Sequence, residues 1–282
     1  HNHSNASDGL FSAEDLVALA YKNGCDALAL TDHDTVANIA PAAAAAKALN
    51  LRFIPGVEIS VSWADKGDVD SLLSTIHIVG LNIDATNTTL LDGLASVTGG
   101  RIIRGKEMAH QLAVAGVDDI FKDAFALAEN KEMLGRTHFA RALVARGIVK
   151  DIGSAFKRYL TPGNPGYVPY RWASLDNAMS WIMAAGGVAV IAHPGRYKLT
   201  KNELAALFQE FKMLGGQSIE VVTGSHSPAE YALFAARCKG FGFLASRGAD
   251  FHGLVETPTE PGMLPRLCDV DRDLQPVWQL FT

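Results

Sequence analysis

The sequence predicts an α/β fold in which short apolar strands alternate with helices around a mainly parallel sheet. The alternation is clearest over residues 10–82 and 174–252, where helix-start signals and β-branched, apolar runs follow one another. The length of 282 residues and the hydrophobic share of 48% suit one large domain of this class, or one domain that carries an insertion.

Helix boundaries give the most local of these signals. Cap residues predict helix starts at Ser12, Ser174, Thr200 and Ser227, the last followed by proline at the first helical position. Glycines predict the ends of the three later helices, at Gly186-Gly187, Gly215-Gly216 and Gly240.

Six short runs rich in Val, Ile, Leu or Phe are predicted to be strands. They are Ala27–Thr31, Phe53–Ile59, Thr75–Leu81, Val188–Ala192, Ser218–Val222 and Phe243–Arg247. Polar residues gather at or just beyond their C-terminal ends. In barrel-like α/β folds the loops at that end converge over the mouth, so we expect one functional site there.

Between residues 97 and 172 the alternation gives way to helical, more basic sequence. Its basic residues are Arg101, Arg104, Lys106, Arg136, Arg141, Arg146, Lys157, Arg158 and Arg171. We interpret this stretch as a helical insertion that caps the barrel mouth. The chain would then divide into a first barrel part at 1–96, a cap at 97–172 and a second barrel part at 173–282.

Composition excludes several classes of protein. No uncharged apolar run of about 18 residues occurs, so we expect no membrane span but a soluble, cytoplasmic protein. The net charge of -5 disfavours binding to long duplex nucleic acid, which depends on Lys and Arg. The three cysteines are widely spaced and indicate neither disulfides nor a sulfur-ligated zinc. Because His1 opens the chain without a methionine, we expect residues upstream of it.

Histidines and carboxylates recur at the predicted strand ends. His1 and His3 are two residues apart, so in extended backbone both rings point to one side, as two ligands of one metal would. Asp250 and His252 repeat this spacing. The candidates between these pairs are Asp8, His33, Glu58, His77 and His193. A single histidine after a strand is more often a hydrogen-bonded loop residue, but six of the nine histidines share this placement. Imidazole with carboxylate suits Mn, Fe or Zn.

These segments resemble the PHP (polymerase and histidinol phosphatase) family over nearly the whole chain. The matching motifs are HxH at residue 1, SDG, TDHD, GVE, HIVG, AHPGR and the late DFH, in that order. The resemblance implies a distorted (βα)7 barrel with up to three metals at its C-terminal mouth. It assigns His1, His3, Glu58 and Asp250 to the first metal, a bridging Glu58 with His77 and His193 to another, and Asp8, His33 and His252 to the third.

Three further motifs resemble the family branch of nucleoside 3′,5′-bisphosphate phosphatases and 5′-to-3′ exoribonucleases. They are RTHFAR at residue 136, YLTPG at 159 and GSHS at 224. The resemblance implies hydrolysis of a pAp-like nucleotide, or of short 5′-phosphorylated RNA, with two or three divalent ions. Mn²⁺ is the metal we expect first, with Fe²⁺ and Zn²⁺ as alternatives. The oligomeric state is left open.

Phosphate ester hydrolysis requires a nucleophile and stabilisation of charge on the phosphate, and clustered metals supply both. A hydroxide bridging two ions is the expected nucleophile, with His33 and His193 among the catalytic residues. The proton for the leaving group can come from Asp34, His193, His226 or a metal-bound water, and the sequence leaves these open.

Basic residues are candidates for binding phosphate. Arg196 follows the strand that ends at His193 and can bind the scissile phosphate as a planar fork. His226 is a further substrate-binding candidate. The cap could bind a second phosphate through Arg101, Arg104, Lys106, Arg136 and His138. Each of these alone is more often part of a solvated helix face.

Three other functions remain open at this stage. A histidinol-phosphate-type monoester phosphatase would not need a second anion site in the cap. An inactive, metal-stabilised binding module would be expected to lack some of the predicted metal ligands, and the sequence has all of them. An amidohydrolase uses similar metal barrels but has no need for Arg196.

Overall fold

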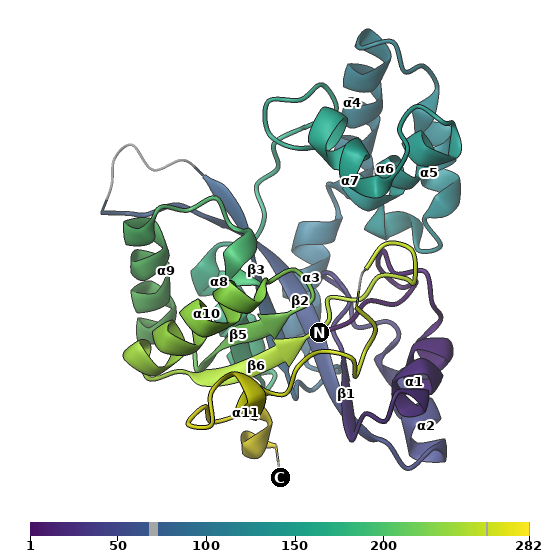
Figure 1. Cartoon of the computed structure of the whole chain (residues 1–282). Helices are drawn as coiled ribbons and strands as arrows, with labels where there is room; N and C mark the ends of the chain where they lie inside the picture. The colour runs from purple at the N-terminus through teal and green to yellow at the C-terminus, as the bar shows by residue number, and fades with distance from the viewer. Residues whose placement is uncertain (68–72, 258, 282) are drawn as a thin grey trace.

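The computed structural model describes residues 1–67, 73–257 and 259–281. Its centre is a curled six-stranded sheet in which the strands follow one another in chain order (Figure 1). The strands are β1 (Ala27–Leu30), β2 (Arg52–Trp63), β3 (Ser74–Leu81), β4 (Val188–Ile191), β5 (Ser218–Thr223) and β6 (Leu244–Gly248). All six predicted strands are confirmed within a few residues, but the described residues show no seventh strand in this sheet.

Strand direction departs from the prediction at β3. The pairs β1–β2, β4–β5 and β5–β6 are parallel, whereas β3 runs antiparallel to both β2 and β4. Only ten residues separate Trp63 from Ser74, and a crossover between parallel neighbours takes a dozen or more. The N-terminal half of β3 therefore lies at the edge of the sheet where the other strands end.

Helices cover the outer side of the sheet. They are α1 (Ala13–Lys22), α2 (Ile39–Ala48), α3 (Thr88–Thr98), α8 (Leu175–Ala184), α9 (Lys201–Met213), α10 (Pro228–Phe241) and α11 (Leu267–Val270). The four predicted caps, Ser12, Ser174, Thr200 and Ser227, each accept a backbone N–H at a helix start. The predicted helix end at Gly240 is wrong. The helix continues to Phe241 and ends at Gly242, which adopts the left-handed conformation with φ 67°.

Residues 101–160 are helical and lie together beyond one end of the sheet (Figure 1). They form α4 (Arg101–Val114), α5 (Ile120–Leu127), α6 (Arg136–Ala145) and α7 (Ile152–Ala155), with short 3-10 and π turns at Lys131–Met133 and Phe156–Leu160. Leu112, Phe139 and Leu143 belong to a hydrophobic cluster separate from the one that joins the sheet to its helices. We call residues 101–160 the helical segment. The boundary expected at residue 97 falls inside α3, which packs against α8.

The inner face of the curled sheet is apolar at one end and polar at the other. Ile54 and Val79 lie in a buried cluster with Val277 and Phe281 of the C-terminal part of the chain. Alternate residues of a strand share a face, so Glu58 of β2 points to the same side as Ile54, nearer the helical segment. The curl thus brings buried carboxylates and imidazoles together at that end.

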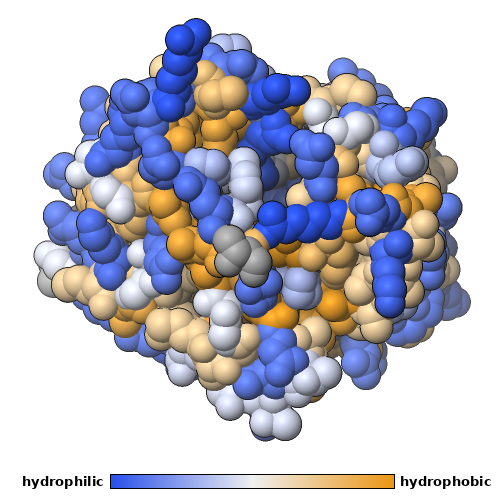
Figure 2. Space-filling model, turned by 90° about the horizontal axis from the view of Figure 1, so that it is seen from below, coloured by the Kyte–Doolittle hydropathy of each residue, from blue (hydrophilic) through white to orange (hydrophobic). Residues whose placement is uncertain are grey.

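The opposite, lower face of the molecule shows apolar side chains between charged ones (Figure 2). A cavity there is lined by residues of β1, β6 and the C-terminal part, including Trp278 and Phe281. Of the candidate metal ligands, only His1 reaches it. In the parts of the chain that the structure describes, no helix has both the length and the apolar character needed to cross a membrane.

Candidate metal centre

The first ligand pair is fixed by backbone pairing between two strands. Thr31, next to β1, donates its N–H to the carbonyl of Asn2 at 3.0 Å, and the N–H of His3 donates to the carbonyl of Phe251 at 2.9 Å. Asn2 is therefore held in extended backbone between the ends of β1 and β6. His1 and His3 consequently lie on one side of this backbone, with their Nε2 atoms 3.1 Å apart.

Glu58 lies at the centre of the imidazoles. Its Oε1 is 3.2 Å from His1 Nε2 and 2.9 Å from His77 Nδ1. Its Oε2 is 3.3 Å from His3 Nε2 and 2.9 Å from His33 Nδ1. A fifth ring, His193, approaches Oε1 at 3.1 Å. The side chain is fully buried, so its charge depends on these neighbours.

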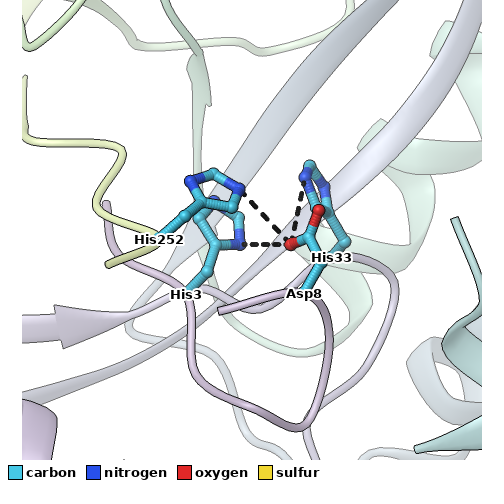
Figure 3. A group of neighbouring side chains, drawn as sticks. All are labelled: His3, Asp8, His33 and His252. Atoms are coloured by element: carbon cyan, nitrogen blue, oxygen red, sulfur yellow. Dashed lines mark ion pairs between the residues drawn. The ribbon is translucent and has the colours of Figure 1, made fainter. Parts of the chain in front are cut away.

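Two further carboxylates flank this centre. Asp250 Oδ1 lies 3.3 Å from His1 Nε2 and 3.1 Å from His3 Nε2. Asp8 Oδ1 faces three imidazoles (Figure 3): His252 Nε2 at 3.3 Å, and His3 Nδ1 and His33 Nε2 at 3.9 Å each.

Three groups of side chains bring potential ligand atoms within 4.8 Å of one another. They are His1, His3, Glu58 and Asp250; His33, Glu58 and His77; and His3, Asp8, His33 and His252. The first group is the set predicted for one metal. The other two share His33, and the group around Asp8 also contains His3; the sequence-based assignment included neither the sharing of His33 nor the presence of His3 in that group. His193 lies against the second group through Glu58.

The charges of the centre are strongly coupled. Burial alone would raise the pKa of Glu58, but the imidazoles of His1 and His33 outweigh it and hold the pKa well below its usual range. The same balance holds the pKa of Asp8 and of Asp250 well below the ordinary carboxyl value. Three buried carboxylates thus remain ionised and attract cations.

The side chains fit divalent metal ions. Several buried ligand atoms have no hydrogen-bond partner among the described residues, namely His3 Nδ1, Asp8 Oδ1, His33 Nδ1, Glu58 Oε2 and His193 Nδ1. His33 Nδ1 and Glu58 Oε2 are close enough for a hydrogen bond but lack its geometry. Leaving such atoms unpaired is costly, and a shared metal would satisfy them.

A pH dependence follows for the metal-free protein. Burial acts to lower the pKa of His252, but Asp8 outweighs it and raises the pKa to about 9. This stabilisation is complete below pH 6.5, where the unfolded histidine is also protonated, and is lost as the pH rises through about 9. Urea unfolding in chelator should therefore show stability falling by on the order of 1–3 kcal/mol from pH 6.5 to 9. His252→Gln should flatten that slope, and an equal slope in both proteins would contradict the assignment.

Four arginines line the pocket beside these ligands: Arg101, Arg104, Arg136 and Arg196. Arg196 is half exposed and contacts Asp250 Oδ2 at 2.5 Å. Among the described residues, Arg104 and Arg136 have only backbone carbonyls as hydrogen-bond acceptors. Burial, followed by the charges of Arg136 and Arg101, lowers the pKa of Arg104 to about 9. The positive charges of Arg104 and Arg136 thus have no carboxylate partner among the described residues, which favours binding of an anion.

Two aromatic residues belong to the same pocket wall. The guanidinium of Arg101 lies 4.7 Å from the ring centre of Trp172, and that of Arg104 lies 5.2 Å from it. Phe156 lies on the side of Arg136, at 5.7 Å from its guanidinium. The pocket therefore offers flat apolar surfaces next to its cations.

Four predicted site residues lie outside both the pocket lining and the ligand groups. Asp34 is buried, and its carboxylate accepts from Ser60 N at 2.8 Å, from Ser60 Oγ at 2.9 Å and from Arg101. Lys106 is exposed on α4. His138 is buried and accepts the N–H of Gly135 at the start of α6, at 3.1 Å. Each of these side chains has a structural partner or faces solvent, and none reaches the ligand groups.

His226 is the fourth. Its Nδ1 donates to the carbonyl of Val221 at 3.1 Å and its Nε2 accepts the N–H of Gly195 at 3.0 Å. The ring also stacks on Phe234, and burial lowers its pKa. With both nitrogens bound to backbone, His226 supports the turn that follows His193 and is not available to a substrate.

Glu220 of β5 was not predicted. It is buried, its Oε1 lies 2.9 Å from His1 Nδ1, and its Oε2 accepts the N–H of His193 at 2.6 Å. His193 has a φ of 26°, which is uncommon for a residue other than glycine, so this hydrogen bond supports an unfavourable backbone conformation. A single carboxylate in an otherwise uncharged strand was the available signal.

The curled sheet is covered by helices and carries three groups of imidazole and carboxylate ligands at one edge. This arrangement is typical of metal-dependent hydrolases with an α/β fold. The PHP domain family model matches residues 1–212. This chain belongs to the PHP domain family.

Relatives cover almost the whole chain. It is 43% identical over 282 residues to the 3′,5′-nucleoside bisphosphate phosphatase of Chromobacterium violaceum, covering 99% of this chain and 94% of that protein. It is 38% identical over 283 residues to the 5′-3′ exoribonuclease Rnm of Escherichia coli, covering 100% and 92%. A solved structure of an amidohydrolase from C. violaceum with bound sulfate and no metal matches with a TM-score of 0.92 and 42% identity, over 99% of this chain and 94% of that one.

Proposed function

We propose that this protein is a metal-dependent phosphoesterase that releases a phosphate from a nucleoside 3′,5′-bisphosphate. The observation that carries this proposal is a single pocket that joins the ligand groups to four arginines, two of them without a carboxylate partner among the described residues. A bisphosphate presents two anionic groups, one for the metal ligands and one for the arginines. The relative at 43% identity is named for this activity.

Different side chains are placed to bind the two phosphates and the metal ions. Arg196, beside Asp250, is placed to bind the phosphate that is cleaved, and Arg104 and Arg136 are placed to bind the other. The ligand groups would hold two or three divalent ions, Mn²⁺ in the first instance, with Fe²⁺ and Zn²⁺ as alternatives. Such ions make water a better nucleophile and neutralise charge on the phosphate.

The leaving group also needs a proton. Of the three side chains considered as its source, Asp34, His193 and His226, only His193 lines the pocket. Its Nδ1 has no hydrogen-bond partner among the described residues. His193 Nδ1 is therefore the side-chain atom that we propose to hold this proton.

A second candidate function is removal of nucleotides from the 5′ end of short RNA. The E. coli relative is named as a 5′-3′ exoribonuclease. Trp172 and Phe156 line the pocket together with the arginines, and aromatic rings next to cations suit a base that follows a phosphate.

The test compares substrates on protein whose bound metal has been measured. If the first candidate function holds, phosphate release should be fastest from 3′,5′-bisphosphates. If the second holds, nucleotides should be released from 5′-phosphorylated oligonucleotides. Mononucleotides and histidinol phosphate serve as monoester comparisons. A preference for histidinol phosphate would favour the monoester phosphatase, and absence of turnover with every ester at full metal content would favour a binding module.

Arg136→Ala should raise KM for a bisphosphate by about 10- to 100-fold, because a hydrogen bond between charged groups contributes about 1.5–3 kcal/mol. Turnover of simple monoesters should change much less. Arg158→Ala is the control, since Arg158 is exposed and does not line the pocket. An equal effect of Arg136→Ala on monoesters and bisphosphates would remove Arg136 from the second phosphate site.

A further inference from the structure

The loop that carries Asp8 is held from two sides. On the sheet side, Asp32 accepts hydrogen bonds from Ser4 N at 2.7 Å and from Ser7 Oγ at 2.6 Å. On the other side, Asn130 of the helical segment donates to the carbonyl of Ala6 at 3.2 Å. The conformation of this loop therefore depends on residues about 120 positions further along the chain.

Thr137 of α6 contacts the carboxylate of Asp8 directly. Its hydroxyl donates to Asp8 Oδ2 at 2.8 Å. The other oxygen, Oδ1, has no hydrogen-bond partner in the part of the chain that the structure describes, and it is the atom that faces the three imidazoles (Figure 3). Thr137 thus anchors one oxygen and leaves the other directed into the ligand group.

Arg141 lies four residues after Thr137, on the same face of α6. Its Nη2 donates to the carbonyl of Asp8 at 2.5 Å. Its Nε and Nη2 also bind the two carboxylate oxygens of Glu256, at 2.6 and 2.7 Å. Glu256 belongs to the loop after His252, in which Thr257 Oγ1 accepts the N–H of His252 at 2.9 Å. Arg141 therefore joins the Asp8 loop to the His252 loop.

We propose that Thr137 and Arg141 are positioning residues that set the metal affinity of one ligand group, the group formed by His3, Asp8, His33 and His252. This inference rests on the proposed function only in taking that group to be a metal site. Mutation of a residue that hydrogen-bonds to a metal ligand typically lowers the metal affinity by 10- to 100-fold. Because α6 begins at Arg136, one helix then carries both a phosphate-binding arginine and the anchor of a metal ligand.

The test titrates full-chain protein, freed of metal, with Mn²⁺ and follows unbound Mn²⁺ by electron paramagnetic resonance without substrate. Thr137→Val keeps the side-chain shape and removes the hydroxyl, so one Mn²⁺ should bind about 10-fold more weakly or worse while the others are unchanged. Thr137→Ser should restore the affinity. Thr98→Val is the matched control, since its hydroxyl donates to the carbonyl of Ala95 within α3.

Arg141→Met should weaken the same Mn²⁺. The matched control is Arg146→Met, because Arg146, the residue that follows α6, binds Asp123 and the carbonyl of Asp119 within the helical segment. If Thr137 acts through Asp8, Thr137→Val should have no further effect on Mn²⁺ binding in an Asp8→Ala background.

Two results would overturn the inference. One is wild-type affinity for every Mn²⁺ in Thr137→Val, and the other is equal weakening of all of them, as a general loss of structure would give. These results are separable from failure of the proposed function. A fully metal-loaded wild type that hydrolyses no phosphoester would refute the function, while a selective loss of one Mn²⁺ in Thr137→Val would still support the positioning role.

Discussion

We expect the Glu58→Gln variant to lose bound metal and turnover together. Glutamine keeps the shape of the side chain but removes its negative charge and one acceptor oxygen. Glu58 lies within 3.3 Å of five imidazoles and belongs to two of the three ligand groups. The loss of turnover should therefore exceed the 10- to 100-fold typical of residues that only support a ligand.

The measurement is metal content per chain by mass spectrometry, together with the rate of phosphate release. Glu210→Gln is the control, because Glu210 is also a largely buried carboxylate that accepts hydrogen bonds, from Trp63 and Lys66, but lies outside the ligand groups. Full metal content and an unchanged rate in Glu58→Gln would show that the ligand groups are not the catalytic centre.

The second large effect is expected when metal is removed from the wild-type protein. An ion that binds only the folded state stabilises it by about 2.7 kcal/mol when its concentration is 100 times Kd. For a chain of this size each kcal/mol moves Tm by about 2–4 °C, so loss of two ions should lower Tm by about 10 °C or more. The charge of the buried carboxylates Asp8, Glu58 and Asp250 would then be balanced only by protonated imidazoles and, at Asp250, by Arg196.

Thermal unfolding followed by circular dichroism, with excess Mn²⁺ or with chelator, measures this difference. The Tm of Glu58→Gln should respond much less to chelator, which separates the metal effect from any general effect of the reagent. An identical Tm of the wild type under both conditions would mean that the groups hold no ion with useful affinity.

Local signals predicted the framework well. The strands have strong apolar and β-branched character, and the helix starts carry cap residues such as Ser12 and Thr200 whose hydrogen bonds involve only near neighbours. The direction of β3 was not predicted, because strand periodicity is the same for parallel and antiparallel pairing. The position of His77 in the centre depends on that direction.

Within the site, prediction worked for side chains that project from strand ends and failed for those whose direction depends on tertiary contacts. Asp34 and His226 are next to or near ligands in sequence, but each is bound to backbone or to a neighbouring side chain. Glu220 was missed because its partners, His1 and the N–H of His193, come from distant parts of the chain.

The separate hydrophobic cluster of the helical segment has a consequence for the evolution of this family. The arginines Arg101, Arg104 and Arg136 come from this segment, whereas the ligand groups come from the sheet and its loops. Substrate preference could therefore diverge by exchange of the segment between relatives. Such a chimaera would function only if the grafted α6 kept the side chains that meet the Asp8 loop, so Thr137 and Arg141 mark the junction at which the two modules must be matched.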